Sequence, residues 1–196
     1  MIISESWLRE WVDSELTTEE LAATLTMAGL EVEGIAPVAR EFIGIVVAEV
    51  RQVTQHPDAD RLRVCSVFDG EHEQQVVCGA PNVVSGMKAP FAMVGAKIKT
   101  EQSKQLKITK AKLRGVESHG MLCSAEELGL EESSDGLMEL PSDAPVGQDL
   151  RAYLQLSDSM IELDLTPNRG DCLGMRGIAR EAVSYTHLTL PTKRIV

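Results

Sequence analysis

The sequence predicts a mostly β chain of the α+β class, in which a small β-barrel is inserted into a discontinuous α+β domain. Three observations predict this arrangement. Between residues 42 and 130, short β-type runs alternate with turn residues at regular intervals, as in a small all-β barrel. The segments before and after this stretch are helical or mixed. Each holds too few helices and strands to form a core alone, so we expect the two to fold together around the insertion.

The composition is that of an ordinary globular protein, because 43% of the 196 residues are hydrophobic and 25% are charged. This length is enough for one domain or two small ones. No apolar run of about eighteen residues occurs and the first residues carry no basic segment, so we expect neither a membrane span nor a signal peptide. We therefore expect a cytoplasmic location.

The four cysteines are scattered along the chain with no C-x-x-C pair: Cys65, Cys78, Cys123 and Cys172. This spacing argues against a zinc knuckle and against the disulfide framework of a small secreted protein. We expect buried, reduced thiols and no bound metal.

Positive charge is concentrated in residues 97–114. The net charge of -11 argues against nonspecific binding of nucleic acid by the whole surface. In this stretch, however, seven basic residues stand against the single acid Glu101, and they are our candidate RNA-binding residues: Lys97, Lys99, Lys104, Lys107, Lys110, Lys112 and Arg114. They form either a solvated strand face that protects a sheet edge or a strip that contacts phosphates.

The first 38 residues predict two helices and a strand. Trp7 and Trp11 fall at helical spacing with Leu8 and Val12, so we expect both tryptophans in the core. In the second helix, Thr17 and Glu20 have the spacing of a capping box, and Gly29 supplies the left-handed residue after its end. Residues 30–35 then alternate like a strand.

Within the barrel, the strand at residues 43–50 leads to a turn in which Pro57 follows His56. A lone histidine before proline in a turn is usually a surface residue, so we expect no catalytic role for His56. The alternation of residues 106–113 slips once, which predicts a β-bulge near Thr109 or Lys110.

Catalytic motifs are absent from the sequence. Ser118 and His119 suggest a nucleophile and a base, but adjacent residues seldom face one another, and no G-x-S-x-G elbow occurs. No Gly-rich phosphate loop and no H-E-x-x-H motif are present either. We expect no catalytic residue in this chain.

After the barrel, residues 149–154 predict a short helix and residues 161–165 a strand. Asp171 is placed as the N-cap of a helix with an apolar stripe that includes Met175 and Ile178. We expect Arg169 and Asp171 to tie strand to helix by local hydrogen bonds.

Three dense motifs resemble the tRNA-binding OB-fold of several translation proteins: His56-Pro-Asp-Ala-Asp-Arg-Leu62, Val77-Cys-Gly-Ala-Pro-Asn82 and residues 113–124. Residues 27–32 and 165–173 narrow the resemblance to the N-terminal region of bacterial phenylalanyl-tRNA synthetase beta subunits, over residues 1–183. We expect a structural role for the motif residues: His56, Pro57, Asp60, Gly79, Asn82, Gly115, Gly120, Asn168, Arg169 and Asp171.

The resemblance implies a heterotetramer of two alpha and two beta subunits that attaches phenylalanine to its tRNA with ATP and Mg²⁺. In this family the alpha subunit carries aminoacylation, and later beta domains carry editing, the alpha interface and anticodon binding. The resemblance therefore implies a non-catalytic part of a ligase with no cofactor of its own, which binds tRNA or has an architectural role. It implies neither DNA nor a membrane as a partner.

With the resemblance, the expected domains are residues 1–38 plus 152–183 for the α+β domain and 39–151 for the OB-fold. Residues 184–196 lack the family pattern and are similar to adaptor, vector or frameshifted sequence, so we exclude them from the fold. The alternative is a free-standing tRNA-binding OB-fold protein that dimerises through its barrel. The segment Thr166-Pro-Asn-Arg169 counts against it, because such modules lack the split outer domain.

Overall fold

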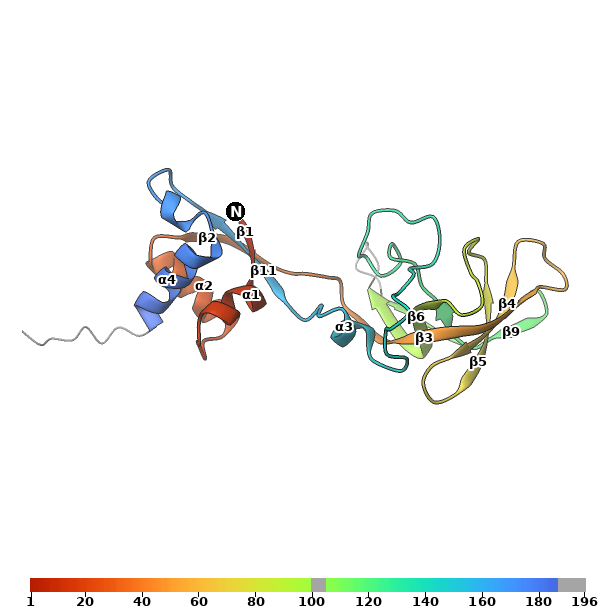
Figure 1. Ribbon diagram of the computed structural model, residues 1–196. Coiled ribbons are helices and arrows are strands. Elements are labelled where there is room, and N and C mark those ends of the chain that lie inside the picture. Colours follow the sequence, from red (N-terminus) through yellow and green to blue (C-terminus); the bar gives the residue numbers. More distant parts are fainter. Residues whose placement is uncertain (100–104, 187–196) are drawn as a thin grey trace, which may run out of the picture. The chain divides into compact units, whose positions relative to one another are not determined.

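The computed structural model describes residues 1–99 and 105–186, and its contacts divide the chain into two units. Unit 1 consists of Met1–Val38 and the chain from Ser157 onward, and unit 2 consists of Ala39–Leu156 (Figure 1). The barrel is thus inserted in the chain between the two parts of unit 1.

A three-stranded antiparallel sheet joins the two parts of unit 1. Its strands are, in spatial order, β1 (Ile2–Ser4), β11 (Ser159–Asp164) and β2 (Glu31–Pro37). The central strand comes from the far side of the insertion, with Ile161 opposite both Ile3 and Ile35. Neither part could therefore complete this sheet alone.

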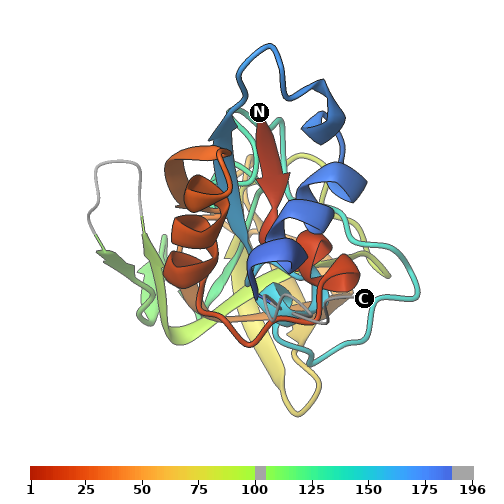
Figure 2. The same cartoon turned by 90° about the vertical axis from the view of Figure 1, so that its left-hand side faces the viewer.

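The helices of unit 1 cover one face of this sheet (Figure 2). They are α1 (Glu5–Trp11), α2 (Thr18–Met27) and α4 (Met175–Thr186), with the 3₁₀ turn η1 (Gly170–Cys172) before α4. The capping box of Thr17 and Glu20 is present, and the Leu30 N–H donates to the Leu25 carbonyl beyond Gly29. The buried core between sheet and helices includes Leu8, Leu21, Leu25, Ile161, Leu163 and Ile178.

The two tryptophans lie outside this core, so the expectation that they are buried is wrong. Leu8 and Val12 are 0% and 3% exposed, whereas Trp7 and Trp11 are 52% and 53% exposed. Trp7 lies about 100° around the seven-residue helix from the buried Leu8, and Val12 is the extended residue that ends the helix. The smaller pair faces the sheet.

Asp171 is not the N-cap of α4, which begins four residues later at Met175. Its carboxylate instead accepts from Arg180 at 2.8 Å and from Arg169 at 3.4 Å. The sequence predicts a helix that begins directly after Asp171, whereas residues 170–172 form a 3₁₀ turn.

Unit 2 is a curled antiparallel sheet in the order β10-β6-β3-β4-β5, with β7 added beside β6. The strands are β3 (Phe42–Gln55), β4 (Arg63–Phe68), β5 (Glu73–Cys78), β6 (Lys88–Lys99), β7 (Gln105–Lys107) and β10 (Met121–Leu122). Gly44, with φ of +79°, lies at a register shift of β3 against β6, and such bulges increase the bend of a strand. A separate two-stranded ladder consists of β8 (Ala111–Leu113) and β9 (Val116–Ser118).

The sheet of unit 2 is buried on both faces along the middle of β3. Val46 and Ala48 point into one apolar cluster with Phe91. Ile45 and Val47 point into another, which is completed by the chain after the barrel and the short helix α3 (Leu150–Tyr153). This explains why β3 is a continuous apolar run in the sequence.

The slip in residues 106–113 is not a bulge within one strand. After β7, Ile108 still exchanges backbone hydrogen bonds with Gly95 and Ala96 of β6. Residues 109–110 then leave the barrel sheet, and the chain continues in β8, which pairs only with β9 among the described strands. Arg114 and Gly115 close this hairpin with φ values of +45° and +90°, the signs that a type I′ turn requires. The change of face therefore marks a change of sheet.

All four cysteines are free and buried, as the sequence predicts. Burial raises the pKa of Cys65 to about 11 and that of Cys123 to about 12. Among residues 1–99 and 105–186, no helix is long and apolar enough to cross a bilayer.

Candidate nucleic-acid interface

His56 is buried, so the expectation that it is a surface residue is wrong. The residue is 3% exposed, and its ring nitrogen Nδ1 accepts a hydrogen bond from the Asp58 N–H at 3.1 Å. The other nitrogen, Nε2, lies 3.1 Å from the Leu113 carbonyl oxygen and must carry the proton that this contact needs. His56 thereby fastens the turn after β3 to the β8–β9 hairpin. Pro57 and Asp60 belong to that turn, and the Asp60 carbonyl accepts from Gln55 Nε2 at 2.9 Å.

The segment at Ser118 and His119 joins the two edges of the curled sheet. The Val77 N–H donates to Ser118 Oγ at 3.0 Å, and the His119 N–H donates to the Gln75 carbonyl at 2.8 Å. Ser118 Oγ itself donates to the Gly120 carbonyl. A buried hydroxyl with both partners in the backbone is a structural element and not an activated nucleophile.

Two further motif residues hold loops against the barrel. The Asn82 side chain donates to the Leu137 carbonyl and accepts from the Leu137 N–H, at 3.0 and 2.9 Å. Gly79 comes directly after β5 and begins the turn that carries Asn82. Side chains of the dense motifs, such as those of His56, Asn82 and Ser118, thus hold loops and segments against the barrel.

The candidate basic residues fall into two groups. Lys97 and Lys107 are cross-strand neighbours on β6 and β7, and Lys99 lies 3.8 Å from Glu41 in an ion pair. Lys110, Lys112 and Arg114 belong to the β8–β9 hairpin and the residue before it, and all three are exposed. Lys104 lies outside the described residues. The structure therefore divides one stretch of sequence between two ladders.

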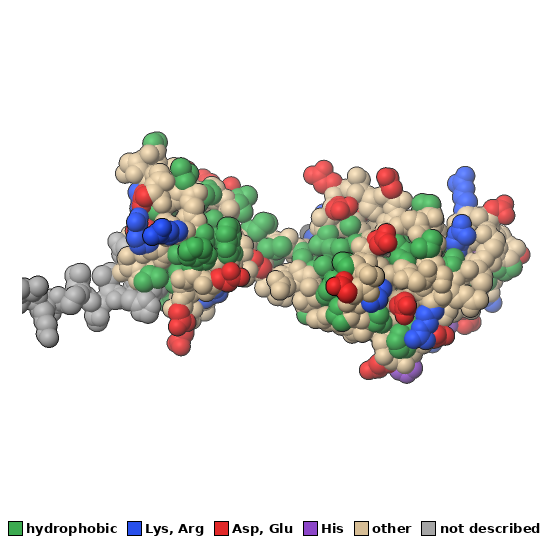
Figure 3. Space-filling view, in the orientation of Figure 1, with side chains coloured by type: hydrophobic (Ala, Val, Ile, Leu, Met, Phe, Trp, Pro, Cys, Tyr) green, Lys and Arg blue, Asp and Glu red, His purple; other side chains and the backbone are tan. Residues whose placement is uncertain are grey.

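Acidic side chains interrupt both groups. Lys112 pairs across its ladder with Glu117, and on the face of unit 2 drawn in Figure 3 the Lys and Arg side chains are interspersed with Asp and Glu. Any contact with phosphates would therefore be local, since a broad basic patch is absent from that face.

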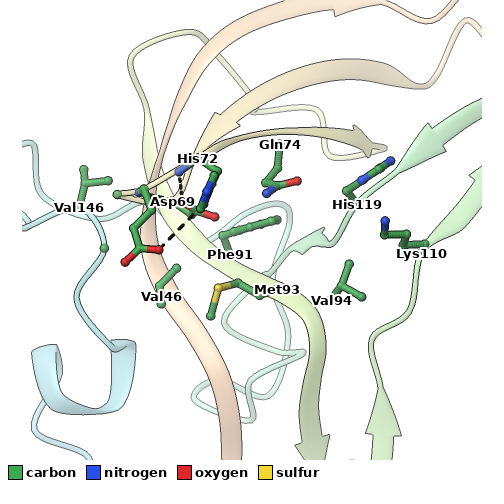
Figure 4. A pocket seen from close by; sticks show the side chains of 13 residues that line it. Val46, Asp69, His72, Gln74, Phe91, Met93, Val94, Lys110, His119 and Val146 are labelled. Atoms are coloured by element: carbon green, nitrogen blue, oxygen red, sulfur yellow. Dashed lines mark hydrogen bonds and ion pairs between the residues drawn. The ribbon is translucent and has the colours of Figure 1, made fainter.

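A cleft of about 690 Å³ lies beside the second basic group. His72, Gln74 and His119 lie along one side, Val46, Met93 and Val94 along the other, and Phe91 between them (Figure 4). Asp69 lies at the end near His72 and Lys110 at the end near His119. A second cleft of about 590 Å³ is bordered by Leu106 and Leu113 and has Lys107 as its one Lys or Arg among the described residues.

The motif around Arg169 lies in unit 1 and joins three elements there. Arg169 donates to the Ala28 carbonyl at the end of α2, to Cys172 Sγ in η1 and to the Asp171 carboxylate, and it lies 3.3 Å from Glu181 of α4. Asn168 accepts from the Thr166 hydroxyl in the preceding turn. The segment therefore has a structural role. The sequence predicts a tie between a strand and a helix, whereas Arg169 joins the end of α2 to η1 and α4.

This cluster does not fit Mg²⁺. Among the described residues, Asp171, Cys172 and Glu181 are near enough to share an ion. Mg²⁺ requires oxygen ligands, however, and both carboxylates are already paired with Arg169 and Arg180. The sequence also lacks a Gly-rich phosphate loop for ATP.

Comparison with protein families matches residues 45–149, more than half of the chain, to the putative tRNA binding domain. The chain belongs to this family. The matched range begins in β3 and ends just before α3, so the tRNA-binding domain is unit 2, including both clefts and the β8–β9 hairpin.

Curated relatives extend the similarity beyond the tRNA-binding domain. The phenylalanine–tRNA ligase beta subunit of Hahella chejuensis is 61% identical over 188 residues, which are 96% of this chain and 23% of that protein. The corresponding subunit of Pseudomonas fluorescens is 60% identical over 92% of this chain and 22% of its own length. The chain thus spans less than a quarter of these relatives, in their N-terminal part.

Among solved structures, a MetRS related protein from Pyrococcus horikoshii is 25% identical, with a TM-score of 0.39, over 53% of this chain and 84% of that chain.

Sequence reasoning about the tRNA-binding domain did not find His72, Gln74 or the cleft that they border. These residues lie in and beside the β4–β5 hairpin, where single polar residues carry no pattern that distinguishes a cleft wall from an ordinary solvated turn. They become neighbours of Lys110 and His119 only when the sheet curls.

Proposed function

We propose that unit 2 binds tRNA and that the chain works as part of the beta subunit of a phenylalanine–tRNA ligase. The match of residues 45–149 to the putative tRNA binding domain carries the first statement. Identity of 60–61% to two such beta subunits, over 92–96% of this chain, supports the second.

The proposed contacts are made by the exposed cations of the two ladders. Lys97 and Lys107 face the same side of their ladder, so one phosphate backbone can pass both. Lys110, Lys112 and Arg114 would contact a second stretch of backbone. Lys99 is a weaker candidate because of its ion pair with Glu41.

For the longer protein, the proposal includes an alpha-subunit partner in a heterotetramer, ATP and Mg²⁺ bound elsewhere, and action in the cytoplasm. The free, buried state of all four cysteines is compatible with a reducing compartment. In this proposal the ATP and Mg²⁺ sites belong to other parts of the longer protein, and the residues of this chain act by positioning tRNA.

A filter-binding titration with tRNA tests this function. Binding should weaken as salt rises, with a slope of log K against log salt of about -0.7 to -0.9 for each neutralised phosphate. The Lys107→Ala/Lys112→Ala variant should reduce the magnitude of that slope by about 1.4–1.8 and weaken binding roughly tenfold at low salt.

The control variant is Arg61→Ala/Arg63→Ala, which removes the same charge from exposed positions on the barrel outside the two groups. It should bind tRNA much as the unaltered chain does. Absence of tRNA binding at low salt would overturn the proposed function, and equal losses in both variants would overturn the proposed contacts.

A free-standing tRNA-binding module is disfavoured by the relatives, whose similarity continues through unit 1. Light scattering decides between the alternatives. A stable homodimer would support the free-standing module, since the subunit proposal requires no self-association of this chain.

A further inference from the structure

We propose that the cleft between His72 and Lys110 holds one unpaired nucleotide of the bound RNA. This inference rests on the proposed function and adds to it a second kind of contact. The basic residues would attract any phosphate backbone, whereas the cleft would require a base that is not stacked in a helix.

The size and floor of the cleft suit a base. Its volume of about 690 Å³ is within the range of roughly 300–1,000 Å³ that small-molecule sites occupy. Val46, Phe91, Met93 and Val94 line its apolar side. Phe91 and Val46 are buried beneath that side, and Val94 is 45% exposed even though it belongs to a barrel strand. An apolar surface left open beside polar groups favours a flat, partly polar ligand.

The opposite side supplies groups that recognise a base. Gln74 offers a donor and an acceptor, and its side chain makes no hydrogen bond with any described residue. The imidazoles of His72 and His119 are planar groups on which a base can stack. His119 is held at one end, with Nε2 at 3.4 Å from Glu117 Oε2.

Charge gives the cleft a direction. At one end, Asp69 Oδ1 accepts from the backbone N–H groups of Glu71 and His72 at 2.9 and 2.7 Å, which fixes the position of His72. At the other end lies the exposed Lys110 (Figure 4). A nucleotide would therefore place its phosphate near Lys110 and its base near His72 and Gln74, away from the repulsion of Asp69 and Glu71.

The direct test uses the whole chain and fluorescently labelled oligoribonucleotides, one single-stranded oligo(A) and one blunt duplex of the same length. The His72→Ala/Gln74→Ala variant should weaken oligo(A) binding at least fivefold, the low end of the loss of roughly 5- to 150-fold expected per stacked base. Its salt slope should be unchanged, because neither side chain neutralises a phosphate. Duplex binding should be unaffected.

The matched control is Gln52→Ala/Gln105→Ala, which removes two exposed glutamines of the same unit outside the cleft. Should the double variant fail to fold, Gln74→Glu keeps the size of the side chain and places a negative charge against the base edge. It should weaken oligo(A) binding in the same way.

Histidine resonances provide a second readout. Oligo(A) should shift the ring-proton signals of His72 and His119 in NMR spectra and leave the signal of the buried His56 in place.

The outcomes separate the two proposals. Wild-type affinity for oligo(A) in both cleft variants, together with weakened binding by Lys107→Ala/Lys112→Ala, would overturn the cleft and leave the proposed function intact. Absence of RNA binding by the unaltered chain would overturn both.

Discussion

At the scale of single residues, the most distinctive positions of the chain act on its backbone. His56 accepts from the turn that follows it and reaches the Leu113 carbonyl across the barrel. Ser118 and Asn82 likewise bind backbone groups of segments distant in sequence. Among the described residues, the lysines and Arg114 proposed to meet RNA are exposed, whereas Gln74 and His119 are half-buried beside the cleft. The side chains proposed for RNA contact are therefore different from those that hold the backbone through His56, Asn82 and Ser118.

Gly120 is a position where only glycine fits. Its φ is +129°, and an added Cβ would lie 2.5 Å from the ring of Phe91, which is fully buried. We expect Gly120→Ala to destabilise the chain by about 2–5 kcal/mol, from overpacking together with backbone strain. Urea unfolding followed by far-UV circular dichroism measures this loss.

The matched control for that measurement is Gly86→Ala. Gly86 has a φ of +87° and no atom within 4 Å of an added Cβ, so it keeps the strain and removes the collision. Its cost should be about 1–2 kcal/mol. Equal losses in the two variants would show that contact with Phe91 does not matter.

At the scale of elements, the short ones depart most from what their sequence predicts. Helix α1 is seven residues long and turns Leu8 inward, so its tryptophans remain outside. Strands β7 and β8 are three residues each and belong to different ladders, although their sequence reads as one strand. The longer α2, with its complete capping box, lies where local pattern alone predicts it.

The exposure of Trp7 and Trp11 should be visible in fluorescence. The chain has two tryptophans, each more than half exposed, so native emission should lie near that of tryptophan in water. Acrylamide and iodide should quench most of it, and unfolding in urea should shift it little. Emission at the wavelength of buried tryptophan, resistant to iodide, would contradict the position of α1.

At the scale of the whole molecule, the two units differ in how they are built and in the features they carry. Unit 1 is assembled from both parts of the chain around β11, and unit 2 carries the family match, the basic ladders and the clefts. The same division separates the exposed tryptophans of unit 1 from the thiols of Cys65, Cys78 and Cys123 in unit 2. The tryptophans thus report on unit 1, and three of the four thiols report on unit 2, with Cys172 in unit 1.

Buried thiols should make the protein less stable in alkali. Burial raises the pKa of Cys65 to about 11, above the value near 8.5 of a cysteine in an unfolded chain. The folded state therefore holds more protons than the unfolded state between these values, so the free energy of unfolding falls as pH rises from about 8.5 toward 11. The stability is fully present at neutral pH.

Urea midpoints between pH 7 and pH 10 measure this fall, and it should be smaller in Cys65→Val.

In the native protein at pH 8, a thiol reagent should label the cysteines slowly, with fast labelling once urea unfolds the chain. Rapid labelling of the native protein would contradict the burial of the four cysteines.

The sequence by itself determined the insertion of a barrel into a mixed frame, the caps of α2, the alternating strands and the absence of a catalytic motif. These features depend on neighbouring residues, through periodicity, turn chemistry and hydrogen bonds within a few positions of one another. Only the tertiary structure decided that His56 is buried, that Trp7 and Trp11 are not, and that the basic stretch is shared between two ladders. It alone brought His72, Gln74 and Lys110 to one cleft, because burial and proximity depend on which face of each short element meets the curled sheet.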